Sequence, residues 1–150
     1  MFYLGFRSSI RYFIEINICY TFVMIGFLVN IEEKTRTNTF FRQVLYTGQH
    51  EQVVVMSLQP NEDIGEEIHE IVDQFLRIEE GVGKVIMSGE EHVIKDGDAF
   101  VVPAGTKHNV INTSSGKALK LYTIYSPPHH KDKTLHKTKA DAIADKENHL

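Results

Sequence analysis

From Phe40 onward, apolar and polar positions alternate in short runs that are separated by turn residues. Successive side chains of a strand point to opposite faces, so this alternation predicts strands with one buried face. No ten-residue stretch of this region has the spacing of an amphipathic helix. The predicted strands are 40–47, 51–60, 73–81, 83–91, 91–98, 98–105, 107–113 and 119–127. Such a ladder of short strands predicts an all-β fold, either a closed barrel or a jelly-roll sandwich.

Turn residues support these boundaries. Ser88-Gly89 and Asp96-Gly97 are tight-turn pairs, and Pro127-Pro128 ends the last strand because proline has no N–H to donate. The remaining segment, 127–150, is polar and rich in His and Lys, with a short helix predicted over 138–148. We expect this segment to be a solvated tail, or an arm that lies on the barrel or on a second subunit.

The first thirty residues differ in composition from the rest of the chain. Fifteen of them are Phe, Ile, Tyr or Asn, and an apolar run from Ile16 to Val29 follows Arg7 and Arg11. This order resembles a signal peptide or a short membrane anchor, although a spanning helix needs about 20 residues. A translation start near Met24 or at Val29, or a helix packed on the domain, are the alternatives. The sequence therefore predicts three regions: a hydrophobic extension over 1–30, a barrel over 31–126 and a polar tail over 127–150.

Composition narrows the possible partners. A chain of 150 residues fits one domain, and Cys19, the only cysteine, excludes an internal disulfide. Residues 31–126 carry 9 basic and 15 acidic side chains, so they offer no basic surface for nucleic acid. We expect a cytoplasmic protein that binds no nucleic acid, with membrane anchoring or export through residues 1–30 as the alternative.

A spaced motif near residue 100 carries the strongest signal. Gly97, Pro103, Gly105, His108 and Asn112 follow the spacing G-x5-P-x-G-x2-H-x3-N. The glycines and the proline mark the turns and ends of two predicted strands. His108 begins a third strand, and we expect its imidazole to point inward. This spacing is the second motif of the cupin superfamily, which the chain resembles from about Phe40 to Tyr125. The resemblance implies a single-domain jelly-roll β-barrel of the cupin-2 type, followed by a short C-terminal tail or helix.

The first cupin motif, G-x5-H-x-H-x(3,4)-E-x6-G, is present in altered form. Aligned from its closing glycine at Gly81, it places Gln74 at the usual Glu position, His69 at the second His and Glu67 at the first. The resemblance therefore implies that Glu67, His69, Gln74 and His108 ligate a divalent metal ion.

The altered ligand set is compatible with metal binding. Glu67 and His69 are two residues apart, so an extended chain directs both to one face. Two imidazoles, one carboxylate and one amide oxygen suit Mn, Fe, Co, Ni or Zn. Their total charge of −1 equals that of the usual three-His, one-Glu site. Other acidic and histidine side chains are expected at the surface: His50, Glu66, Glu70, Asp73, His92, His129, His130 and His136. The alternatives are a metal or proton-transfer role for Asp73 and metal binding by the three histidines of the tail.

Residues after about 38 resemble a group of small bacterial cupins that are sometimes labelled mannose-6-phosphate isomerase. The resemblance implies a homodimer that binds a small oxygen-rich molecule, with metal-dependent isomerisation or epimerisation as one activity. An Fe- or Mn-dependent dioxygenase and a non-catalytic ligand- or metal-sensing module are the alternatives. The sequence singles out no catalytic residue, because it contains no His–carboxylate pair beyond the ligands.

Overall fold

All eight strands expected from the sequence are present in the computed structural model, which describes residues 26–146. They are β1 Arg42–Thr47, β2 Gln52–Leu58, β3 Asp73–Glu80, β4 Val82–Met87, β5 Glu90–Lys95, β6 Ala99–Val102, β7 His108–Asn112 and β8 Leu119–Ser126. The expectations for residues 1–25 lie outside the described residues. Within 26–146, no helix has the length and apolar character needed to cross a membrane.

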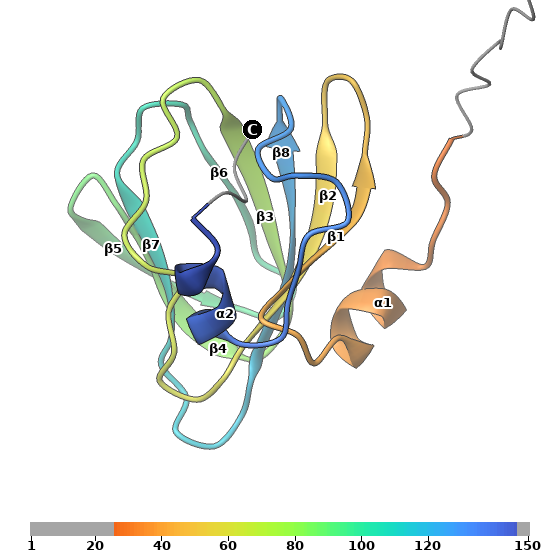
Figure 1. The fold of residues 1–150 in the computed structure, drawn as a ribbon. Helices are drawn as coiled ribbons and strands as arrows, with labels where there is room; N and C mark the ends of the chain where they lie inside the picture. Colours follow the sequence, from red (N-terminus) through yellow and green to blue (C-terminus); the bar gives the residue numbers. More distant parts are fainter. Residues whose placement is uncertain (1–25, 147–150) are drawn as a thin grey trace, which may run out of the picture.

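The strands form two antiparallel layers that face each other (Figure 1). One sheet has six strands in the order β6-β3-β8-β2-β1-β9, where β9 is Leu135–His136, and the other has three in the order β5-β4-β7. Strands that are neighbours in the sheet, such as β3 and β8, are distant in sequence, as in a jelly roll. The prediction of an all-β jelly-roll fold is therefore confirmed.

The inward face of the six-stranded sheet changes from apolar to polar along its length. Met56, Leu121 and Ile78 are paired across β2, β8 and β3, and all three are almost fully buried. Four residues further along β8, Tyr125 is paired with Gln52 on one side and Gln74 on the other, and these three are also buried. The apolar row supplies core burial at one end of the barrel, and the polar row surrounds the candidate site at the other.

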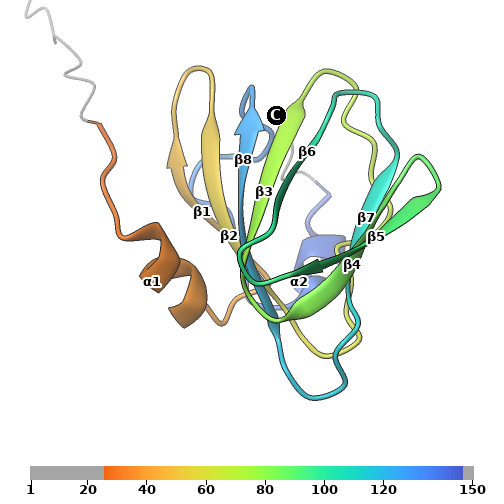
Figure 2. The same cartoon turned by 180° about the vertical axis from the view of Figure 1, so that it is seen from behind.

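A short helix that the sequence pattern did not predict covers the outer face of the six-stranded sheet. Helix α1, Ile31–Thr37, contacts β8, β2 and β3 and is seen on the outside of the barrel in Figure 2. Asn30 caps it by accepting a hydrogen bond from Glu33 N at 3.2 Å, and Thr35 is buried against the sheet. A seven-residue helix has too few turns for a readable period, so its stability comes from this packing.

The chain after Ser126 is an arm that lies on the barrel. Strand β9, Leu135–His136, adds a sixth strand next to β1, and helix α2, Lys139–Ala144, follows with a capping box between Thr138 and Asp141. Gln52 Oε1 accepts from His130 N at 2.9 Å, and its Nε2 donates to His130 O at 2.6 Å. Since His130 and His136 are buried, the expectation of a solvated histidine tail is wrong for these two residues.

Candidate metal centre

The segment that carries Glu67 and His69 lies alongside β7, although it is not a regular strand. Glu67 and His108 exchange both backbone hydrogen bonds, at 2.9 and 3.0 Å, and Asn112 N donates to Glu62 O at 2.8 Å. Side chains alternate accordingly: Glu67 and His69 turn inward, whereas their neighbours, Glu66, Ile68 and Glu70, are exposed. The main chain therefore fixes both candidate ligands on the inner face, as their spacing predicts.

The loop between β6 and β7 holds His69 from the other side. Gly105 N donates to His69 O at 2.8 Å, and Gly105 has φ +78°, a conformation that favours glycine. Three residues later His108 begins β7 and is almost fully buried. The glycine of the second motif thus connects the backbone of one candidate ligand to the loop that presents another.

The structure brings the four expected ligands together. The ligand atoms of Glu67, His69 and His108 all lie within 4.8 Å of one another. Gln74, at the start of β3, places Oε1 at 3.1 Å from His108 Nε2. His69 Nε2 lies 3.3 Å from Glu67 Oε2.

The hydrogen bonds of the two imidazoles suit a bound cation. His108 Nδ1 lies 2.9 Å from the carbonyl oxygen of Thr106, which accepts and cannot donate, so the proton is on Nδ1. His108 Nε2 then directs a lone pair toward Gln74 Oε1, another lone-pair donor. His69 Nε2 is buried without a well-formed hydrogen bond within residues 26–146, and the polar group beside it is Glu67 Oε2 at 3.3 Å. A metal ion would satisfy these three atoms together, so the donor set fits the group that the resemblance implies.

The charges of the cluster also favour metal binding. Burial alone would raise the pKa of Glu67, but His69, Arg42 and His108 together hold that pKa below its ordinary value. Burial lowers the pKa of His108. This effect outweighs the increase in pKa that the hydrogen bond to Thr106 and the nearby Glu67 carboxylate would cause. At neutral pH the carboxylate is therefore ionised and the imidazole is neutral, the forms in which both bind metals.

The lowered pKa of His108 predicts a loss of stability in acid for the metal-stripped protein. As the pH falls below about 6.5, the unfolded chain takes up a proton at this position before the folded chain does, so the free energy of unfolding decreases. Thermal unfolding in EDTA should give a lower midpoint at pH 5.5 than at pH 7.5. The difference should shrink in His108→Asn and remain in His92→Asn, whose imidazole is exposed. An unchanged pH dependence in His108→Asn would show that His108 does not cause the loss of stability in acid.

Comparison with known proteins agrees with this arrangement. The cupin domain family matches residues 54–125, which contain all four candidate ligands. The chain belongs to the cupin superfamily. This cupin is 55% identical over 124 residues to YrkC, an uncharacterised protein of Bacillus subtilis strain 168, across 79% of this chain and 66% of YrkC. It is 46% identical over 108 residues to an uncharacterised protein of Acanthamoeba polyphaga mimivirus, across 69% of this chain and 67% of that protein.

A solved structure extends the comparison to the three-dimensional level. The crystal structure of BH2720 from Bacillus halodurans is 49% identical in sequence and superposes with a TM-score of 0.78, over 82% of this cupin and 97% of that chain. The two curated relatives are each matched over only about two thirds of their own length. The likeness therefore shows the family and the fold, and the activity of this cupin has to be argued from its site.

Two side chains at the site of this cupin were not expected from the sequence. Arg42, the first residue of β1, places Nη2 at 3.6 Å from Glu67 Oε1. The ring of His129 lies 4.2 Å from that of His69, measured between centroids, so its expected place in a solvated tail is wrong. With Glu67 and Ile68, these two histidines line a pocket of about 240 Å³.

The sequence signals that could have placed Arg42 and His129 at the site differ in strength. Arg42 has the strand parity of buried Val44, which is a weak indication that it faces inward. His129 follows Pro127-Pro128, where no periodicity remains to place a side chain. Only the fold of the arm brings it to the cluster.

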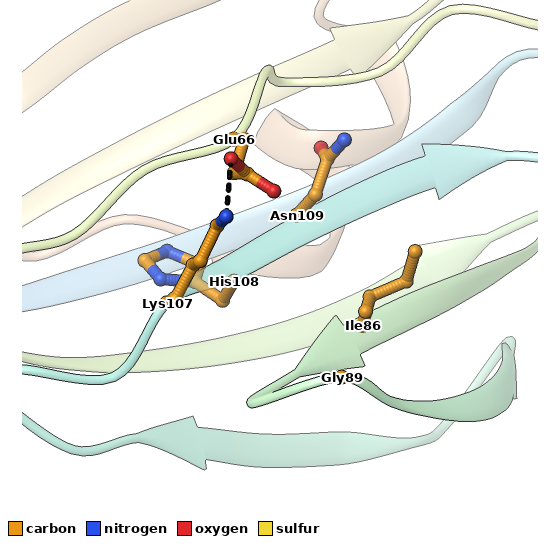
Figure 3. Close-up of a pocket in the computed structure, with 6 residues that line it drawn as sticks. All are labelled: Glu66, Ile86, Gly89, Lys107, His108 and Asn109. Atoms are coloured by element: carbon orange, nitrogen blue, oxygen red, sulfur yellow. Dashed lines mark ion pairs between the residues drawn. The ribbon is translucent and has the colours of Figure 1, made fainter.

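A second hollow lies beside the start of β7, between that strand and the turn after β4 (Figure 3). Its volume is about 170 Å³, and its charged groups, Glu66 and Lys107, pair with each other at 2.8 Å. His108 borders it, but both ring nitrogens of His108 face Thr106 and Gln74. The expectation that Glu66 is a surface acid is confirmed, and neither charged side chain of this hollow belongs to the candidate cluster.

Proposed function

We propose that this cupin binds one divalent metal ion through Glu67, His69, Gln74 and His108 and presents it to a small oxygen-rich molecule. The observation that carries the proposal is the convergence of the ligand atoms of Glu67, His69 and His108 within 4.8 Å, where His108 Nε2 and Gln74 Oε1 face each other as two acceptors. Lone pairs that face one another in a buried site are costly unless a cation lies between them. Mn, Fe, Co, Ni and Zn all accept such a mixed nitrogen and oxygen set.

The pocket lined by Glu67, Ile68, His69 and His129 is where an external ligand would reach the ion. Tyr125 supports this wall, because its ring lies 5.8 Å from His69 and is stacked 5.5 Å from His129, measured between centroids. A bound divalent ion would supply Lewis acidity to a carbonyl or hydroxyl oxygen. The rings orient the incoming molecule and keep bulk water away from its apolar side.

Two functions follow from this geometry. Isomerisation or epimerisation of a sugar phosphate is the finer proposal, since polarisation of a carbonyl is the chemistry that it requires. A non-catalytic module that binds a chelating molecule is the second, and it is supported by the pocket lining, in which Glu67 is the only carboxylate. Aldose–ketose conversion of mannose 6-phosphate by the metal-loaded protein, against a metal-stripped control, distinguishes them.

Metal binding is tested first on the full-length protein. Elemental analysis after gel filtration should find about one divalent ion per chain. Because a ligand that binds only the folded state stabilises it, adding metal at 100 times its Kd to the EDTA-treated protein should raise stability by about 2.7 kcal/mol. The thermal midpoint should rise with metal concentration and return after chelation. A midpoint that no transition metal changes would overturn the proposal.

A further inference from the structure

Arg42 is a buried cation with incomplete hydrogen bonding. Its side chain is 5% exposed, and its one ion pair within residues 26–146 is the contact with Glu67 at 3.6 Å. The Nε atom is buried and has no hydrogen-bond partner in this part of the chain. The guanidinium also lies 5.6 Å from the centre of the Phe41 ring. A guanidinium has five N–H donors, so this side chain has unused donors in a place where water is scarce.

Arg42 lines a cavity next to the candidate metal cluster. The cavity has a volume of about 110 Å³ and is lined in part by residues of α2, the short helix drawn in front of the sheets in Figure 1. Its lining consists of Phe41, Arg42, Ile64, Glu67, Lys139, Ala142 and Ile143. Lys139 is paired with Asp63, so its charge is compensated. Glu67 lines both this cavity and the pocket at His129.

Metal binding would change the charge balance around Arg42. Without metal, Glu67 is the counter-ion of the guanidinium. If a divalent ion takes that carboxylate, as the proposed function requires, the ion, Glu67 and Arg42 together carry a formal charge of +2. A buried cation beside an excess of positive charge is unfavourable, and an anion that reaches both would relieve it.

We propose that the metal-loaded site selects an oxyanion, a carboxylate or phosphate group that Arg42 binds while a neighbouring oxygen of the same molecule reaches the metal. The guanidinium fork matches such groups with two parallel hydrogen bonds, and the cavity has room for a group of that size. This inference rests on the proposed metal site and adds the charge of its ligand. It also couples the two binding events: the oxyanion and the metal each increase the affinity for the other.

The test compares three small probes on the Mn²⁺-loaded full-length protein by titration calorimetry. Glycolate and ethylene glycol have similar size and oxygen spacing but differ in charge, and inorganic phosphate distinguishes phosphate from carboxylate recognition. Charge-assisted hydrogen bonds to arginine should make at least one oxyanion bind about 10- to 100-fold more tightly than ethylene glycol. Equal affinities for all three probes would overturn the inference.

Variants locate the effect at Arg42. Arg42→Met should lose about tenfold or more of the oxyanion affinity, and Arg42→Lys should retain part of it because the charge stays and the fork is lost. Mn²⁺ affinity without an oxyanion should hold or increase in Arg42→Met, since a positive neighbour of the ion is removed. Lys84→Met, which removes a half-buried charge that is paired with Glu91 and does not line this cavity, should behave as wild type. Unchanged oxyanion affinity in both Arg42 variants would contradict the inference.

Elemental analysis of the same samples separates the two proposals. Wild-type protein that holds no Mn²⁺ would overturn the metal site and this inference with it. Protein that holds Mn²⁺ but shows no preference for oxyanions would overturn this inference alone. Circular dichroism verifies that each variant is folded, and Arg42→Lys serves if Arg42→Met is not.

Discussion

Replacing His69 or His108 with alanine is expected to reduce bound metal from about one ion per chain to near zero. Each change removes a buried imidazole nitrogen from a cluster whose ligand atoms lie within 4.8 Å of one another. Loss of a group that only supports a metal ligand costs about 10- to 100-fold in affinity, so loss of a ligand itself should cost more. The measurement is elemental analysis after gel filtration, with a competition titration for the metal Kd.

The matched control for these variants is His92→Ala. His92 is an exposed histidine of β5, and its contact with Glu90 at 3.8 Å lies outside the cluster. The His92→Ala variant should retain the metal content and the metal affinity of the wild type. Equal metal content in wild type and both ligand variants would show that any bound metal is held elsewhere.

Gly81→Ala is expected to be far more destabilising than Gly89→Ala, although both glycines have positive φ, +99° and +88°. A Cβ at position 81 would lie 2.7 Å from Ala118 O, whereas one at position 89 would meet nothing within 4 Å. Backbone strain should cost about 1 kcal/mol at either site, and the clash should increase the cost at Gly81 to about 3 kcal/mol or more.

Urea denaturation of the metal-stripped proteins measures both free energies of unfolding. Each variant serves as the control for the other, since strain at positive φ is common to both and only the contact with Ala118 and Leu119 differs. Equal losses would show that the backbone moves to admit the methyl group at Gly81. A larger loss would explain in physical terms why a glycine closes the first motif.

The strands were predictable because their burial pattern is a property of local sequence. Each strand of a sandwich has one inward face, so alternation along β8, from buried Leu119 to buried Tyr125, reports its structure directly. Helix α1 and strand β9 carry no such pattern. The helix is seven residues long, the strand two, and both are stabilised by contacts with distant parts of the chain.

The candidate ligands were predictable for a different reason. Gly81 and Gly105 lie at turns with positive φ, and their fixed spacing to the candidate ligands, Gln74 before Gly81 and His108 after Gly105, is what the motifs record. Arg42 and His129 lie outside both motifs. Their positions depend on how β1 and the C-terminal arm pack, so a linear motif contains no information about them.

The backbone pairing of Glu67 with His108 has a consequence for how this site can vary. Main-chain hydrogen bonds position both residues, and Gln74 is likewise fixed in β3 between β6 and β8. Because none of these bonds involves a ligand side chain, a substitution at position 67 or 74 can alter the donor atoms while the frame stays in place. Metal preference in such a barrel can therefore evolve separately from the fold, by single replacements on a fixed template.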